Sequence, residues 1–202
     1  MRIDEKLNFV MPIFGNDDEI EAYVHSMPIG RDAFRANYML LSVTFTALHN
    51  QGLSEATAPK ISAMLLQDVA KQQNFDATPL LNEILRLSCL IKAGSSGWET
   101  IPLQESINRK LIDQDDADEV MGALVFFTLA SWAPPKRIAK QIVAGAARLW
   151  AAQISSLQST EWIASLPTLT ATDNSGATAP SNTFNQMTVS QNNTTFTSSL
   201  PS

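Results

Sequence analysis

The sequence predicts a mainly α domain of about six helices, with a small N-terminal β-hairpin and a disordered C-terminal tail. Two observations lead to this prediction. After Pro28, apolar residues recur at spacings of three and four, the period of an amphipathic helix. The composition then changes at Pro167, because 22 of the last 36 residues are Ser, Thr, Asn or Gln and Asp173 is their only ionisable residue. We therefore expect a folded domain over residues 1–166 and a flexible tail over residues 167–202.

The hairpin is expected at about residues 7–27. The run from Leu7 to Phe14 is rich in β-forming residues, and residues 15–18 form a turn cluster. In the second run, Ile20, Ala22 and Val24 alternate with the residues between them, which is the pattern of a strand. Pro12 lacks a backbone N–H and therefore predicts that the first strand lies at a sheet edge.

Three helices are expected between Pro28 and Gly94. The first ends at residues 50–52, and the second begins near Pro59. The third begins with Thr78 as its cap and Pro79 in its first turn, and it ends at Gly94. Their apolar faces are, in order, Phe34, Tyr38, Leu41, Phe45 and Leu48; Ile61, Leu65 and Val69; and Leu80, Ile84, Leu87 and Ile91.

Three further helices are expected before the tail. A short helix runs from about Pro102 to Leu111, after a loop at residues 94–97. The next has a capping box of Asp116 and Glu119 and continues to about Trp132. Two prolines at residues 134–135 interrupt the chain. The last helix carries Ile138, Ile142, Leu149, Ile154 and Leu157.

Charge and composition argue against several classes of protein. Apolar residues make up 45% of the 202 residues, which is enough to bury a core, and the net charge of −6 argues against a free-standing nucleic-acid binder. The one cysteine, Cys89, excludes an internal disulfide framework and a cysteine-based zinc cluster. The N-terminus lacks the features of a signal peptide, and no apolar stretch approaches the ~20 residues of a membrane span. The protein is therefore expected to stay in a cytoplasm.

The residues that suggest chemistry have structural explanations. Carboxylates at residues 113–119 resemble a calcium loop, but Ala117, Asp118 and Leu124 occupy three of its defining positions, so these carboxylates are expected to complement the start of a helix. His25 and Cys89 lie in different predicted elements, and whether they meet in the fold is not evident from the sequence. We expect no catalytic, cofactor-binding or metal-binding residues, and a protein that is not an enzyme.

The segment at residues 120–160 holds four cations and no carboxylate. Cations at a helix start oppose the helix dipole, so they either pair with the acidic run elsewhere in the fold or contact an acidic partner. Adjacent residues point about 100° apart on a helix, so Phe126 and Phe127 indicate either a helix buried on several sides or an interface. The candidate partner-binding residues are Phe126, Phe127, Trp132, Lys136, Arg137, Lys140 and Trp150.

Several segments resemble tail assembly chaperones of long-tailed bacteriophages, over most of the chain. The matching segments are YVHS at 23–26 with PI at 28–29, GWETIPL at 97–103, GALVFFT at 122–128, ARLW at 147–150, ISSL at 154–157, STE at 159–161 and SLPT at 165–168. The similarity includes the Ser- and Thr-rich tail.

The resemblance implies a small, mostly helical, non-catalytic protein that acts in the host cytoplasm. Such chaperones coat the helical tape measure protein before the tail polymerises and help to recruit tail tube subunits. A second copy of this chain is a further candidate partner. The N-terminal hairpin departs from the simplest pattern of the family, and it leaves open a second interpretation, a minor structural protein of the virion tail or of the head–tail junction.

Overall fold

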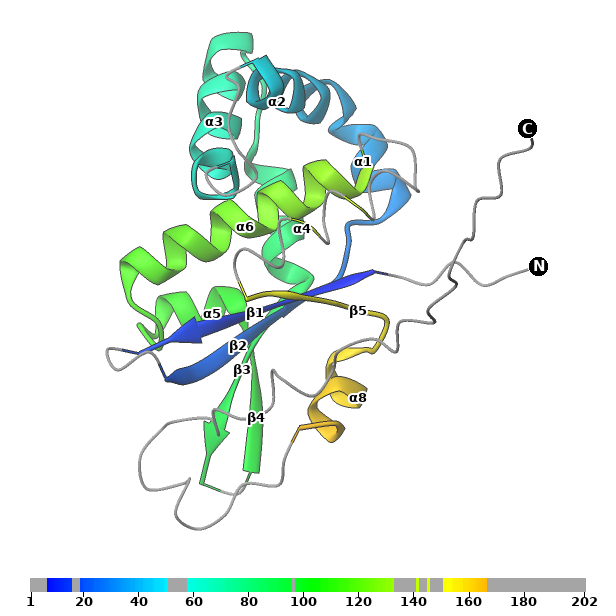
Figure 1. Cartoon of the computed structure of the whole chain (residues 1–202). Coiled ribbons are helices and arrows are strands. Elements are labelled where there is room, and N and C mark those ends of the chain that lie inside the picture. Colours follow the sequence, from blue (N-terminus) through cyan, green and yellow to red (C-terminus); the bar gives the residue numbers. More distant parts are fainter. Residues whose placement is uncertain are drawn as a thin grey trace, which may run out of the picture.

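A five-stranded antiparallel sheet lies at the centre of the molecule, with strands in the order β4-β3-β2-β1-β5 (Figure 1). The computed structural model describes residues 7–15, 19–50, 58–95, 97–132, 141, 145 and 151–166. The strands are β1 (Asn8–Phe14), β2 (Ile20–Ser26), β3 (Ser88–Gly94), β4 (Gly97–Pro102) and β5 (Gln153–Ser155). The prediction of a mainly α domain with only a small hairpin is therefore wrong, because the hairpin is part of a much larger sheet.

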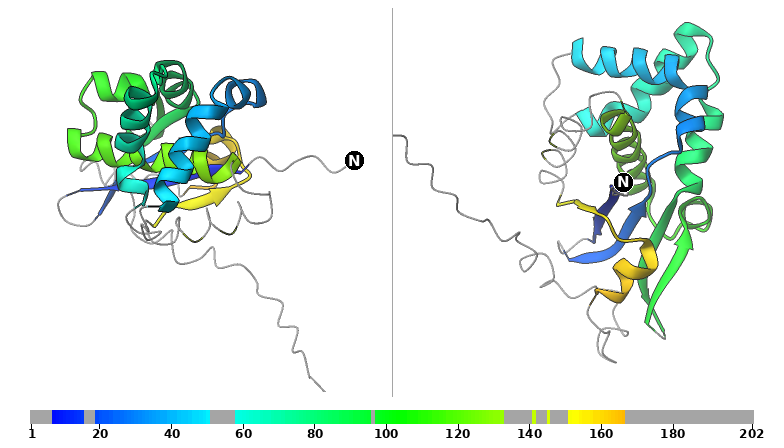
Figure 2. Two further views of the ribbon diagram at one scale, coloured as in Figure 1. Left: turned by 90° about the horizontal axis from the view of Figure 1, so that it is seen from above. Right: turned by 90° about the vertical axis from the view of Figure 1, so that its right-hand side faces the viewer.

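The helices lie on both sides of this sheet (Figures 1 and 2). They are α1 (Arg31–Ala36), α2 (Tyr38–Asn50), α3 (Ala58–Gln73), α4 (Thr78–Arg86), α5 (Leu103–Asn108), α6 (Gln114–Trp132) and α8 (Ser159–Ala164). The first six pack with Phe9, Met11, Val24 and Leu90 in the main core. Helix α8 covers the opposite face, where its Trp162 packs with Val10, Tyr23 and Ile91. The three central strands β1, β2 and β3 therefore send residues into two separate cores on opposite faces of the sheet.

The hairpin is confirmed at the predicted position, and β1 pairs with β2 from Phe9 to Phe14. On its other side β1 pairs with β5 only from Asn8 to Val10. Pro12 therefore lies in the part of β1 that has no described strand on that side. The prediction that this strand lies at a sheet edge is wrong for the strand as a whole, because β5 lies outside β1 in the sheet. Pro12 itself lies beyond the short pairing with β5, where its missing N–H is tolerated more easily.

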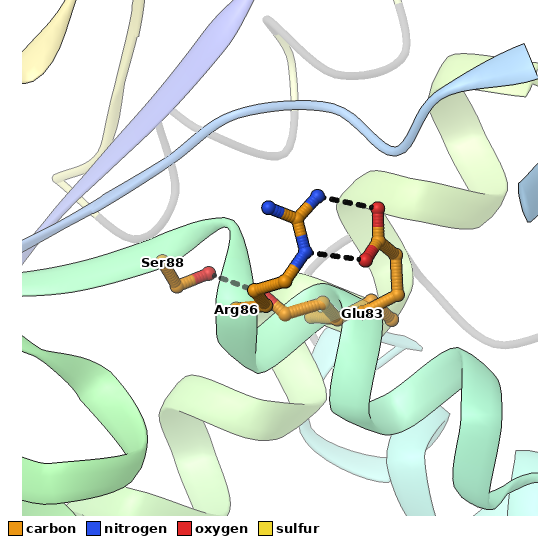
Figure 3. Close-up of polar contacts among 4 residues, drawn as sticks. Glu83, Arg86 and Ser88 are labelled. Carbon is orange, nitrogen blue, oxygen red and sulfur yellow. Dashed lines mark hydrogen bonds and ion pairs between the residues drawn. The ribbon is translucent and has the colours of Figure 1, made fainter.

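The third predicted helix is too long, because it ends at Arg86 and not at Gly94 (Figure 3). Arg86 binds both carboxylate oxygens of Glu83 at 2.7 and 2.9 Å, and the Ser88 hydroxyl donates to the carbonyl of Ile84 at 2.7 Å. These contacts stabilise the last turn of α4. Residues 88–94 then form β3, which pairs with β2. Its apolar residues fit a helical spacing, but the pairing with β2 decides their conformation.

Three other helix predictions need correction. In the last predicted helix, Ile154 lies in β5 opposite Phe9, and Leu157 lies in the turn that follows; Ile138, Ile142 and Leu149 lie outside the described residues. The first predicted helix is divided at Asn37, whose side chain donates to the carbonyl of Ala33 at 2.9 Å. The cap of α6 is Asp113, which accepts from the amide of Asp116 at 2.8 Å, and not the predicted Asp116–Glu119 pair.

Helices α3 and α6 cross with their backbones in direct contact at Gly122. A Cβ atom built on Gly122 would lie 2.5 Å from the carbonyl oxygen of Pro59 and 3.1 Å from that of Lys60. Both neighbours are backbone atoms, so a side chain here requires the two helices to move apart. Gly122 is therefore the residue that permits this crossing.

We expect Gly122→Ala to lower the free energy of unfolding by about 1–3 kcal/mol, the usual cost of overpacking. Alanine favours a helix interior over glycine by about 1 kcal/mol, so a helix without this crossing would be stabilised instead. Urea denaturation measures the change, and Glu119→Ala, on the exposed side of the same helix, is the control. A Gly122→Ala variant as stable as the wild type would contradict the close crossing.

Candidate functional site

The two adjacent phenylalanines of α6 have different environments. Phe127 is 2% exposed, and its ring stacks on that of Phe9 with centroids 5.3 Å apart. Phe126 is half-buried and packs against the edge of the main core. The sequence leaves two alternatives for these residues, a helix buried on several sides or an interface. The first alternative holds for Phe127, which is a core residue. Only Phe126 is partly accessible to a partner.

Trp132 is half-buried at the end of α6 and contacts α1. Its ring stacks on Phe34 with centroids 4.6 Å apart and planes at 13°. The remaining candidate residues Lys136, Arg137, Lys140 and Trp150 lie outside the described residues. Trp132 is therefore the candidate partner-binding residue around which a site can be described.

These surroundings form a groove, which we name the α2–α6 groove. Its volume is about 180 Å³. It is lined by Phe34, Tyr38, Leu41, Ser42, Phe45, Thr46, Thr128, Leu129 and Trp132. The hydroxyls of Thr46 and Thr128 donate to carbonyls of their own helices at 2.9 and 2.8 Å. These bound hydroxyls lie among the aromatic and aliphatic side chains, so the groove presents a mixed surface whose apolar and polar parts are of similar extent.

Two large apolar side chains stand exposed at the start of α2: Tyr38, which lines the groove, and Met39, which follows it in the chain. Tyr38 is 53% exposed and Met39 is 58% exposed. The Tyr38 ring contacts Phe34 edge-on at 5.8 Å, so it continues the aromatic wall that Phe34 and Trp132 begin. The sequence predicts Tyr38 within a buried stripe, but the break at Asn37 separates it from the helix that carries Phe34. A contiguous apolar surface of this kind is typical of a binding site.

The groove lies in a region with few carboxylates. Arg31 and Arg35 on α1 are exposed, and neither forms an ion pair with any described residue. Asp32 is the one acidic residue of α1 and α2. The half of α6 that borders the groove, from Val120 to Trp132, carries no charge at all. Positive charge therefore predominates beside the apolar lining.

The other end of α6 is acidic. It begins ~27 Å from Trp132, at 1.5 Å per residue. There, Glu21, Asp113 and Asp116 line a cavity of about 630 Å³ together with Lys92 and Lys110. Burial raises the pKa of Asp116, and the neighbouring carboxylates raise it further. Among the described residues, no three His, Cys, Asp or Glu side chains are placed to hold a metal ion. Asp113 also serves as the cap of α6.

His25 and Cys89 do meet in the fold, as cross-strand partners on the face that α8 covers. The Cys89 thiol donates to the backbone carbonyl of His25 at 3.7 Å, and burial raises its pKa to about 11. His25 is 1% exposed, its Nε2 lies 3.1 Å from the Leu157 carbonyl, and burial lowers its pKa. A nucleophilic cysteine needs a thiolate, whereas this thiol stays protonated at neutral pH. Together these residues attach residues 157–162 to the sheet.

Comparison with protein-family models, with curated proteins and with solved structures gave no match to this chain. Within the described ranges, each helix is too short or too polar to cross a membrane. The α2–α6 groove is therefore identified as the candidate site from its geometry and not from a related protein. Four of its nine lining residues, Phe34, Tyr38, Leu41 and Phe45, belong to the apolar stripe that the sequence predicts as core, and the signal that distinguishes them is the break at Asn37.

Proposed function

We propose that this chain is a non-catalytic assembly chaperone of a long-tailed bacteriophage. It binds the tape measure protein and helps to recruit tail tube subunits during tail morphogenesis in the host cytoplasm. The observation that supports this proposal is the α2–α6 groove, where aromatic and aliphatic side chains line a recess next to the exposed Tyr38. The resemblance of the sequence to tail assembly chaperones points to the same role.

The shape of the groove suits a helical partner. Two helices, α2 and α6, form its sides, and an amphipathic helix can place its apolar stripe along such a surface. A tape measure protein presents long helices whose apolar stripes have no partner before the tail assembles. Covering one stripe buries apolar surface on both molecules, which is the main driving force for association.

Co-expression with the tape measure and tail tube proteins, followed by pull-down, tests the proposal. We expect the double variant Tyr38→Ser, Met39→Ser to bind the tape measure protein about 30-fold more weakly, because interface hot spots contribute about 2 kcal/mol or more. Both side chains are exposed, so the fold is expected to be kept. The matched control is Met64→Ser, Phe75→Ser, which removes two exposed apolar side chains outside the groove.

Equal capture by the groove variant, the control variant and the wild type would contradict the assignment of the groove. Failure of the wild type to capture the tape measure protein would contradict the chaperone function itself.

A second candidate function is a minor structural protein of the virion tail or of the head–tail junction. The observation that favours it is the five-stranded sheet, which departs from the mostly helical pattern of tail assembly chaperones. Mass spectrometry of purified virions separates the two functions. A chaperone is expected to be absent or far below stoichiometric amounts, whereas a structural component is retained in a fixed ratio to the tail proteins.

A further inference from the structure

The charged residues beside the α2–α6 groove are mostly positive. Arg31 and Arg35 are four residues apart on α1, so they share one face of that helix, and Phe34 of the same helix lines the groove. Both arginines are exposed, and no described residue pairs with either. Asp32 is the one carboxylate on α1 and α2.

Helix stability explains only one of these arginines. Arg35 lies in the last turn of α1, where a positive charge complements the helix dipole. Arg31 lies at the first residue of α1, where its charge opposes the dipole. An exposed cation in that position contributes nothing to the helix, but it is well placed to meet a negative charge on a molecule bound next to Phe34.

The groove is large enough for one bulky apolar side chain. Its volume of about 180 Å³ exceeds the ~150 Å³ of an apolar cavity that binds benzene. The aromatic rings of Phe34 and Trp132 form one wall, and Leu41 and Leu129 contribute aliphatic surface. The site therefore combines a recess lined by aromatic, aliphatic and hydroxyl side chains, which can take an anchor side chain, with two cations on the adjoining helix α1.

We propose that the α2–α6 groove selects an amphipathic helix that carries carboxylates beside its apolar stripe. One leucine or phenylalanine of the stripe enters the recess, and the carboxylates pair with Arg31 and Arg35. This inference rests on the proposed function, in which the groove is the partner-binding site, and it adds the charge of the partner. The whole chain has a net charge of −6, so a preference for an acidic helix opposes the overall electrostatic field and requires local cations.

Two synthetic helical peptides test the inference with the full chain. They share one stripe of leucines at positions i, i+3, i+4 and i+7, and they differ in having either glutamate or lysine beside it. By fluorescence anisotropy at low salt, we expect the glutamate peptide to bind ~10-fold more tightly or better, with the preference falling as salt is added. The double variant Arg31→Gln, Arg35→Gln is expected to lose the preference but keep binding through the apolar stripe.

The control variant Lys71→Gln, Arg109→Gln removes the same charge from exposed positions outside the groove, and it is expected to keep the preference. Equal binding of the two peptides, tighter binding of the lysine peptide, or binding of neither peptide would overturn the inference. A preference that survives in the Arg31→Gln, Arg35→Gln variant would overturn it as well. Capture of the tape measure protein in the pull-down does not depend on these peptides, so the two proposals fail separately.

Discussion

Replacing Phe127 by alanine is expected to lower the free energy of unfolding by about 3–5 kcal/mol, the range for truncation of a buried aromatic residue. Phe127 is almost fully buried, and its ring stacks on Phe9 of β1, so it joins α6 directly to the sheet. Removing the ring leaves a cavity between the two elements, and neither can move to fill it because α6 is also held against α3 at Gly122. Urea denaturation followed by circular dichroism measures the loss.

Phe126→Ala is the matched control for this experiment, because the two residues are neighbours of the same type on the same helix. Phe126 is half-buried, so we expect its truncation to cost less than half as much. Equal losses at the two positions would mean that α6 is rotated relative to the arrangement described above. A larger loss at Phe126 would identify that residue as the core position.

Replacing Trp162 by alanine is expected to cost about 3–5 kcal/mol of the free energy that holds α8 on the sheet. Trp162 is 5% exposed, and it meets the ring of Tyr23 edge-on with centroids 4.9 Å apart. It is the one buried residue of α8, and Ile163 of the same helix packs on this cluster only half-buried. Hydrogen exchange measured by mass spectrometry is expected to show faster exchange at residues 158–165.

Trp98→Ala provides the control, because Trp98 contacts the same cluster from β4 but is only half-buried. We expect the amides of α8 to keep most of their protection in that variant. If Trp162→Ala leaves the exchange of residues 158–165 unchanged, the hydrogen bonds that Asn8 and His25 make to the Leu157 carbonyl are sufficient to hold this segment.

Local sequence patterns predict the elements that depend on local interactions. The alternation of Ile20, Ala22 and Val24 and the turn cluster predict the hairpin of β1 and β2, and the apolar face of Ile61, Leu65 and Val69 predicts α3. The existence of these elements therefore follows from residues close in the chain. Strands β3 and β5 depend on partners far away. Cys89 pairs with His25, and Ile154 pairs with Phe9, so their conformation is decided by residues that a local pattern does not include.

The sequence predicts only part of the candidate site, because the site also depends on contacts between residues far apart in the chain. Trp132 was predicted from the concentration of aromatic residues in the second half of the chain, and it does line the groove. The same aromatic wall continues with Phe34 and Tyr38, which lie almost one hundred residues earlier and whose spacing suggests a continuous buried stripe. The hydrogen bond of Asn37 to Ala33 divides that stripe, and its effect on the exposure of Tyr38 is evident only in the folded chain.

The pairing of β1 with β5 has a consequence for folding during synthesis. Asn8 and Leu157 are joined by a hydrogen bond across a separation of 149 residues, and contacts of such long range are formed late. At ~5–20 residues per second, the ribosome needs ~7–30 s to synthesise the intervening chain. During that time the outer edge of β1 offers unpaired amide and carbonyl groups to any other extended chain, including a second nascent copy. Folding of this protein is therefore most vulnerable to aggregation before residue 153 has been made, and a chain truncated ahead of β5 would keep that exposed edge permanently.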